Sequence, residues 1–334
     1  MRGSRSVWIV AAFVVLGACS LDWDALDPSL GGSSTSTGGA ATGGTGGDGG
    51  VGATGGDPTT TTTSSSGGAG GVGGAGGGGC TGSPAGTLVS RQLITRYFID
   101  EAGTGDGPAQ LIDAAPMPLD LPITYAGGNV YSQTDCRRGM TWPAISLDGR
   151  ANTLVAGTKV ETELDGSTTG TIECVLELTD ADPSSSRISH IGTDTHPGRF
   201  TMFSDGATSL GFDWDDQAGL VMDTVEQWTV DHLALGRLVA HIVLDTNLAT
   251  PSDRVRLYVN GTDHGPGDVI ENPMAQGAQT EIIAATDSYG VGNRAVGGRS
   301  IEGTIYYCAM YAAALSPEEV AQNAAALMMG DDTP

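Results

Sequence analysis

Two short acidic stretches carry the side chains that calcium prefers. They hold the carboxylates of Asp100, Glu101 and Asp106 in "DEAGTGDG", and of Asp213, Asp215 and Asp216 in "FDWDDQ". Calcium takes roughly six to eight oxygen ligands, which surface loops often supply. Neither stretch has the spacing of an EF-hand loop, because Ala218 stands where the second would need glycine. Both are candidate calcium loops, with solvated acidic turns as the alternative.

A third group of carboxylates has a spacing used in glycoside hydrolysis, where one acid protonates the leaving group and another attacks. Glu161, Glu163 and Asp165 alternate, and alternate residues share one face of a strand. The pattern resembles the E-x-D-x-x-E strand of glucanases, but Thr168 replaces the last glutamate and the segment reads as a turn. None of the five histidines lies near a G-x-S-x-G nucleophile turn. The residues therefore provide no positive evidence of catalysis, and we expect a protein that is not an enzyme.

Aromatic rings can recognise sugars by stacking beside polar hydrogen-bonding groups. Trp142, Trp214 and Trp228 are the candidates, and a position in the core is the alternative for each. Trp214 lies among aspartates that should face solvent. Trp214 and Trp142 are therefore the candidate ligand-stacking residues.

Cys19 closes an apolar run at the start of the chain. Two arginines precede the apolar residues 7–18, and small residues stand just before the cysteine, which is the layout of a secretory signal. The run is shorter than the roughly 20 apolar residues of a membrane-spanning helix. Residues 16–19, "LGAC", resemble the bacterial lipobox, which implies removal of a signal peptide at residues 1–18 and acylation of Cys19. An ordinary signal peptide is the alternative. With Ser20 in the next position, the segment resembles outer-membrane lipoproteins under the sorting rule of enteric bacteria, which implies the outer membrane of a bacterial cell envelope.

The other cysteines are Cys80, Cys136, Cys174 and Cys308. An even set in an exported chain predicts disulfides, and the residues alone leave all three pairings open. A zinc site suits the sequence less well, because no close Cys-x-x-Cys or Cys/His spacing occurs.

Acidic residues dominate the charge of the chain. Lys and Arg total 15 against 39 Asp and Glu, which makes the formal net charge -24. Such a surface repels phosphate backbones, so a nucleic-acid partner is not expected. The single lysine, Lys159, reflects compositional bias rather than a catalytic amine.

Residues 19–86 are rich in glycine, serine and threonine and carry almost no large apolar side chains. They cannot bury enough surface to offset the entropy of ordering. We therefore predict a disordered tether that holds the following domain away from the membrane. Its glycines do not indicate a phosphate-binding loop, because no Lys-Ser or Lys-Thr follows them.

Short β-rich runs closed by turn residues follow the tether. In "RVRLYVNG", Val255, Leu257 and Val259 alternate with polar residues, and Asn260-Gly261 supplies the pair that a tight hairpin turn requires. Only the end of the chain reads as a helix, with Ser316 as N-cap and Glu319 completing a capping box. This helix should pack three side chains onto the edge of the β-structure: Val320, Ala324 and Leu327.

Several segments occur in a characteristic order along residues 87–330: "LITRYFIDEAGTGDG", "AISLDG", "GTIECVLEL", "RLYVNG" and "GTIYYCAMYAAALSPEEV". Together they resemble the laminin G-like, concanavalin A-like domains of bacterial surface proteins. The resemblance implies an all-β, two-sheet antiparallel jelly-roll sandwich with a short C-terminal helix. The sequence departs from the family in placing cysteines in two strands and in "LVAH", where His241 is interpreted as a partly buried structural residue.

The resemblance also implies a pairing and a metal. Cys174 and Cys308 fall in segments similar to marker strands, which favours a bond between them and leaves Cys80 to pair with Cys136. Many laminin G-like domains hold Ca²⁺ at the rim of the sandwich, so Asp100 and Glu101 are the preferred calcium ligands. Calcium is the only cofactor that we expect.

We therefore expect a lipid-anchored module of the bacterial envelope, joined to the membrane through Cys19. Its partner would be a glycan or an envelope or extracellular protein, bound without catalysis. The alternatives are a degenerate glucanase-like hydrolase and a structural surface protein without a small ligand.

Overall fold

The computed structural model describes residues 83–101, 106–134, 137–183, 185–193, 198–217 and 224–333. All of them belong to the compact unit Gly73–Pro334. The predicted signal peptide, the predicted tether up to residue 82, and Cys19, Cys80 and Cys136 lie outside the described residues. Within the part of the chain that is described, no helix is both long and apolar enough to cross a membrane.

Two antiparallel sheets form the domain, as predicted. The first is an 8-stranded sheet with the order β14-β13-β12-β7-β17-β5-β4, and β1 also pairs with β17. Its strands are β1 (Leu93–Tyr97), β4 (Val130–Thr134), β5 (Arg137–Trp142), β7 (Thr169–Asp180), β12 (Leu238–Asp245), β13 (Val255–Val259), β14 (Thr262–Asp263) and β17 (Glu302–Tyr311).

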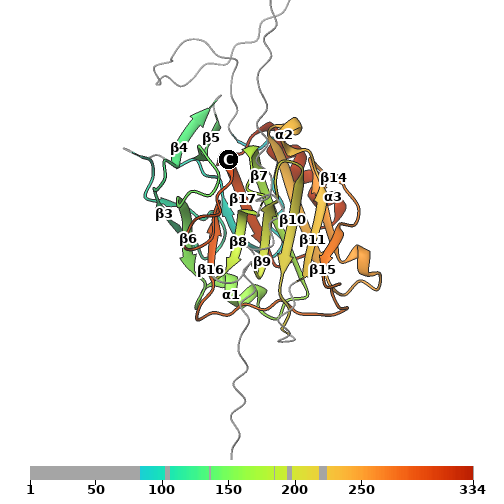
Figure 1. The fold of residues 1–334 in the computed structure, drawn as a ribbon. Helices are drawn as coiled ribbons and strands as arrows, with labels where there is room; N and C mark the ends of the chain where they lie inside the picture. The colour runs from blue at the N-terminus through green and yellow to red at the C-terminus, as the bar shows by residue number, and fades with distance from the viewer. Residues whose placement is uncertain are drawn as a thin grey trace, which may run out of the picture. The chain divides into compact units, whose positions relative to one another are not determined.

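The second is a 9-stranded sheet with the order β15-β11-β10-β9-β8-β16-β6-β3-β2. Its strands are β2 (Gln110–Leu111), β3 (Leu121–Thr124), β6 (Arg150–Leu154), β8 (Ser186–Gly192), β9 (Phe200–Ser204), β10 (Ser209–Trp214), β11 (Thr224–Thr229), β15 (Asp268–Glu271) and β16 (Ser288–Val291). Figure 1 shows β8, β9, β10 and β11 side by side in this layer. The helical segments are α1 (Lys159–Leu164), α2 (His232–Leu235), the 3-10 turn η3 (Pro251–Asp253) and α3 (Pro317–Met329). The all-β, two-sheet prediction with a C-terminal helix is confirmed.

The hairpin that begins with β13 follows directly from its sequence. Leu257 and its alternate neighbours enter the main core between the sheets, whereas Tyr258 packs in a second cluster on the outer face. Asn260 and Gly261 have φ values of 52° and 79°. Successive residues with positive φ turn a right-twisted hairpin, which is why Asn-Gly occurs here.

The disulfide predicted between Cys174 and Cys308 is present. The two residues lie opposite each other on β7 and β17, and both are fully buried in the main core. Neighbouring strands at the centre of the first sheet are thus joined covalently.

Helix α3 covers part of the outer face of the first sheet. Ser316 accepts a hydrogen bond from the backbone of Glu319, whose side chain accepts from the backbone of Ser316, which is the predicted capping box. The buried side chains of α3 contact the outer face of the first sheet, where Val175 and Val239 lie. They do not pack on the edge of the sheet, in contrast to the prediction. The helix therefore builds a second, smaller core outside the sandwich.

Lys159 has a structural role that its isolation in the sequence did not predict. Its ammonium group is paired with Asp113 at 2.6 Å, and both side chains are buried. Asp113 also accepts backbone hydrogen bonds from Arg96, Ala115 and Leu119. The pair fixes α1 against the first strands, because a buried charge is tolerated only when it is paired and hydrogen-bonded.

Candidate functional site

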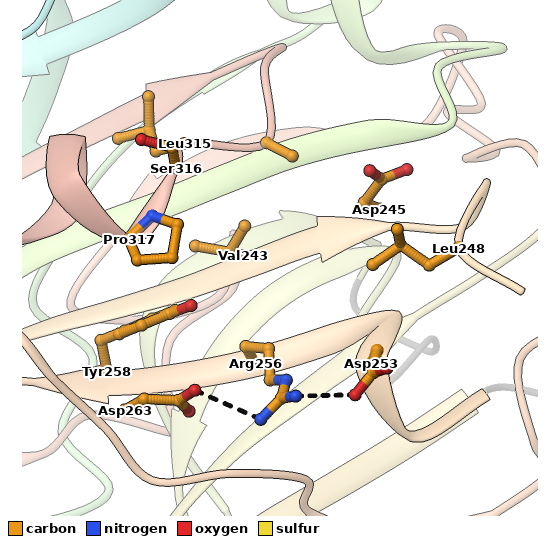
Figure 2. A pocket seen from close by; sticks show the side chains of 11 residues that line it. Val243, Asp245, Leu248, Asp253, Arg256, Tyr258, Asp263, Leu315, Ser316 and Pro317 are labelled. Carbon is orange, nitrogen blue, oxygen red and sulfur yellow. Dashed lines mark hydrogen bonds and ion pairs between the residues drawn. The ribbon is translucent and has the colours of Figure 1, made fainter. Parts of the chain in front are cut away.

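A pocket of about 430 Å³ lies on the outer face of the first sheet, beside the start of α3 (Figure 2). Val243 of β12 and Tyr258 of β13 contribute from the sheet, and Leu248 contributes from the following loop. Pro317 at the start of α3 closes another side. This volume falls within the range of roughly 300–1,000 Å³ that is usual for small-molecule sites.

The pocket exists because α3 covers only one end of β12 and β13. A side chain added at Gly261, at the hairpin end, would touch Ala321 and Ala324, so the helix lies directly over that end. The capping box begins α3 at Pro317 and leaves the other end of the two strands without helical cover. The strand faces near Val243 therefore border open space.

Tyr258 is the central polar group of the pocket. The residue as a whole is 6% exposed, and its hydroxyl, which is open to the pocket, forms no hydrogen bond with any described residue. Figure 2 shows the side chain lying along the pocket with its hydroxyl directed into it. Burial raises the pKa of Tyr258, and the nearby Asp263 carboxylate raises it further. The phenol thus keeps its proton and can both donate and accept a hydrogen bond.

The charged groups of the pocket are mostly acidic. Arg256 pairs with Asp253 at 2.6 Å and with Asp263 at 3.2 Å, as the dashed lines in Figure 2 show. Asp245 lines the pocket as well, and its carboxylate accepts hydrogen bonds from the backbone and side chain of Asn247. The lining thus contains three aspartates and one arginine.

This combination suits a ligand that carries several hydroxyl groups. The carboxylates accept hydrogen bonds, the Tyr258 hydroxyl donates or accepts, and Arg256 donates. Val243, Leu248 and Pro317 offer apolar contact beside these polar groups. Sequence reasoning placed Tyr258 only within a hairpin. The available signal was its position on the opposite face of β13 from the core residues.

The predicted stacking residues are not available to a ligand. Trp142 and Trp214 are each 1% exposed and belong to the main core. The indole of Trp142 donates to the carbonyl of Gly149, and that of Trp214 donates to the hydroxyl of Thr280. Both predictions are corrected: Trp214 follows the alternating pattern of β10 into the core, and only the aspartates around it suggested exposure.

The first predicted calcium loop does not gather its carboxylates. Asp100 accepts a hydrogen bond from the backbone of Thr333, and Glu101 accepts one from the backbone of Ile112. Asp106 is exposed. Burial raises the pKa of Glu101. The carboxylates of Asp100 and Glu101 thus support the backbone of two separate segments.

In the second predicted loop, one carboxylate is paired with an arginine and another lies in a buried strand. Arg199 pairs with Asp215 at 2.7 Å and with Asp287 at 3.0 Å, and it also contacts Glu281. Asp213 is buried in β10. Within the described ranges, no group of three or more His, Cys, Asp or Glu side chains is placed to hold a metal ion. The described carboxylates do not fit a calcium centre, and calcium binding stays a prediction.

The carboxylates with hydrolase-like spacing do not share a strand face. Glu161 and Glu163 lie on α1, and Asp165 caps its C-terminal end. Glu161 accepts a hydrogen bond from the backbone of Gly157, and Asp165 accepts one from the backbone of Ile282. Their roles are local, because residues two apart on a helix point in different directions.

Glu226 is an acidic residue that the sequence analysis missed. It pairs with Phe212 across β10 and β11, which places its side chain on the core face of the second sheet. Its side chain is 4% exposed, and no described residue forms a hydrogen bond or ion pair with it. Burial alone raises the pKa of Glu226 to about 7. The sequence pattern that could have identified Glu226 is a charged residue at an inward-facing position of β11, between the inward-facing Thr224 and Trp228.

A buried polar network lies under α3, also unforeseen in the sequence. Glu173 on β7 and His241 on β12 are fully buried and 2.7 Å apart. Tyr307, Tyr311 and Asn323 donate further hydrogen bonds to the Glu173 carboxylate. Burial would raise the pKa of Glu173, but the hydrogen bonds from these groups and from His241 hold it below its ordinary value. His241 is structural, as predicted, but it is fully rather than partly buried.

No protein-family model matches this sequence, and the search of curated proteins returns no match. One similar solved structure is Trypanosoma rangeli sialidase in complex with the inhibitor DANA, at 11% identity and a TM-score of 0.47 over 74% of this chain and 35% of that chain. Another is domain 4 of a GH43 extracellular arabinanase from Geobacillus stearothermophilus in complex with arabinotriose, at 14% identity and a TM-score of 0.40 over 71% of this chain and 100% of that one.

A third similar structure is the binding domain of botulinum neurotoxin DC in complex with rat synaptotagmin II. It is 10% identical, with a TM-score of 0.46 over 69% of this chain and 50% of that one. The chain thus spans only about 35% of the sialidase that it matches. At these identities and TM-scores, neither a family nor an activity is assigned from the likeness.

Proposed function

We propose that this chain is a non-catalytic binding module of the bacterial cell envelope and that the pocket beside α3 recognises a saccharide. The observation that carries the proposal is the Tyr258 hydroxyl, which is open to the pocket and forms no hydrogen bond with any described residue. A hydroxyl open to a pocket binds water in the free protein, and a ligand group can take the place of that water. A hydroxyl-rich ligand would supply that partner and would also satisfy the carboxylates around it.

The charge of the pocket narrows the class of saccharide. Its aspartates outnumber its one arginine, and that arginine is already paired with two of them. Uronic and sialic acids carry carboxylates that these groups would repel. The proposed ligand is therefore a saccharide without negative charge.

The position of the pocket suits a domain carried on a tether. The first described residues, Ser83 and Ala85, bond to Thr333 and to Ala326 near the C-terminal end of α3. The pocket lies at the other end of that 13-residue helix. At 1.5 Å per residue the helix spans about 20 Å, so the tether would enter well away from the ligand.

The proposal includes the anchor that the sequence predicts. Cys19, acylated after signal-peptide removal, would attach the chain to the outer membrane through several acyl chains, which hold far more firmly than one. The similarity of its segments to laminin G-like domains supports a binding role. Displaying the pocket on a tether suits capture of a partner outside the cell.

Glu226 favours one alternative function, a glycoside hydrolase. A general acid of that reaction needs a raised pKa at neutral pH, and burial raises the pKa of Glu226 to about 7. The reaction also needs a second carboxylate about 5–10 Å away. The cross-strand neighbours of Glu226 are Phe212 and Val269, and no charged group among the described residues contributes to its raised pKa. We therefore retain binding as the proposed function.

A glycan array probed with the full, oxidised chain tests the proposal, with and without Ca²⁺. We expect retention of an uncharged or cationic saccharide class and no release of new reducing ends from it. Release of reducing ends that Glu226→Gln abolishes would establish the hydrolase instead. If the chain binds no glycan on the array, either with or without Ca²⁺, the saccharide proposal is overturned.

A further inference from the structure

We propose that β15 is a pH-operated edge strand, which stays paired with β11 while Glu226 is protonated and is released when Glu226 ionises. This switch lies in the second sheet, whereas the pocket beside α3 lies on the first sheet. Three features support it: the position of Glu226 inside the sandwich, the short and exposed β15 that covers it, and the lack of a compensating charge.

Glu226 occupies a position on β11 that the alternation of the strand directs into the core. Its neighbours on the same face of β11 are Thr224 and Trp228, and Phe212 of the main core lies opposite it on β10. The residue is 4% exposed, and none of the described residues forms a hydrogen bond or ion pair with it. A carboxylate here would lose hydration without gaining a partner, whereas the neutral acid loses much less. The closed sandwich therefore favours the protonated form.

β15 is the last strand on its side of the second sheet and lies beside β11 (Figure 1). Val269 lies opposite Glu226, so β15 covers this part of the inner face. The strand has only four residues, and its pairing shifts register between Val225 and Glu226. Val269 and Ile270 are 50% and 55% exposed, so release of β15 would give up little apolar burial. Because segments with few buried contacts open at low free energy, release of β15 is the easiest way to hydrate Glu226.

No charge on the strands around Glu226 compensates its ionisation. The residues that share its face on β10, β11 and β15 do not titrate: Phe212, Thr224, Trp228 and Val269. The acidic residues of β15, Asp268 and Glu271, belong to pairs that point to the other face of the sheet. Burial is the only cause of the raised pKa of Glu226, without a contribution from any charged residue of the described structure. The pairing of β15 therefore responds to the proton on Glu226.

The direction of the switch follows from the pKa of Glu226 in the two states. The pKa is about 7 in the closed domain and returns to its ordinary 4.5 when the carboxyl group reaches water. Because the closed state binds the proton more tightly, the released state gains population as pH rises between these values. The gain is about 40-fold from pH ~5 to pH ~7 and less than about twofold from pH ~7 to pH ~8. Release leaves the backbone of β11 unpaired, an edge that another strand can join.

Hydrogen–deuterium exchange of the full chain, followed by mass spectrometry from pH ~5 to pH ~8, tests the switch. Rates are divided by the intrinsic rate at each pH, which gives protection factors. We expect the paired amides of β15 to be less protected than those of β12 at every pH, because β12 lies inside the first sheet. The protection of β15 should fall about 40-fold from pH ~5 to pH ~7 and then level off.

Urea below the unfolding transition separates local release from global unfolding. Local release exposes little surface, so the protection of β15 should not change with low urea, whereas that of β12 should fall. Equal protection of β15 and β12 at every pH would show that β15 opens only when the whole domain unfolds. That result, or a protection of β15 that is constant with pH, would overturn the proposal.

Two variants identify the group that operates the strand. Glu226→Gln keeps the shape of the side chain without its charge, and it should hold β15 at the wild-type low-pH protection up to pH ~8. Asp268→Asn is the matched control, because it removes an acidic charge from the exposed face of β15 itself, and it should retain the wild-type fall. If Glu226→Gln keeps the pH dependence, or if Asp268→Asn abolishes it, a different group operates the strand and the proposal is overturned.

Discussion

Cys174 and Cys308 lie directly opposite each other on β7 and β17, with their Cα atoms 4.2 Å apart. The bond joins segments separated by 134 residues. Closing so long a loop restricts the unfolded chain, so replacing both cysteines with alanine should lower the free energy of unfolding by about 4 kcal/mol. Denaturant unfolding of the two proteins measures this difference. Equal midpoints would show that the bond contributes nothing to stability.

Glu226 should make stability depend on pH. Burial raises its pKa in the folded protein from an ordinary 4.5 to about 7, so the folded state holds a proton that the unfolded state releases within that window. Stability should therefore fall as pH rises from about 4.5 to 7, by up to about 3 kcal/mol. Glu226→Gln should flatten this dependence and stabilise the protein above pH ~7. A wild-type curve that is already flat across the window would contradict the assignment.

The pair formed by Glu173 and His241 should make stability depend on pH in the opposite direction. Because the pKa of Glu173 is lowered, its contribution is present at neutral pH and is lost as pH falls below the ordinary value of 4.5. His241→Leu removes one partner of a fully buried pair and should cost about 3–5 kcal/mol. His241→Gln retains an N–H donor and should cost less. The prediction fails if the two variants unfold at the same denaturant concentration.

Tyr258→Phe should separate binding from folding. The substitution removes only a hydroxyl that has no partner in the described structure, so thermal stability should be unchanged or slightly higher. If the hydroxyl meets the ligand, affinity for the recognised saccharide should fall by about fivefold, which corresponds to about 1 kcal/mol. Unchanged affinity would remove Tyr258 from the site.

The parts of the fold that followed from the sequence rest on local patterns. Alternation in β13, the Asn260-Gly261 turn and the Ser316 capping box each act within a few residues, and all appear where expected. The predicted pairing of Cys174 with Cys308 is also present, although the residues alone had left all three pairings open. The strand, the turn and the capping box require no knowledge of distant contacts.

The site was harder to predict because it depends on where elements end relative to one another. Acidic neighbours suggested an exposed Trp214, but alternation in β10 takes its ring into the core. Tyr258 gains its role only because α3 begins at Pro317 and leaves the strand end beneath it open. Neither segment alone predicts this contact, because the two segments are far apart in the chain.

A substitution that fills the pocket beside α3 tests most directly whether this pocket binds a saccharide. Ala314 lines it next to Leu315, and Ala314→Trp would place an indole in its space. The wild type and this variant, each as the full chain, would be compared on one glycan array at equal concentration, after circular dichroism shows that both are folded. The account predicts that the wild type retains a saccharide class and that Ala314→Trp loses it. Equal retention by the two proteins would place the binding site elsewhere and contradict the account.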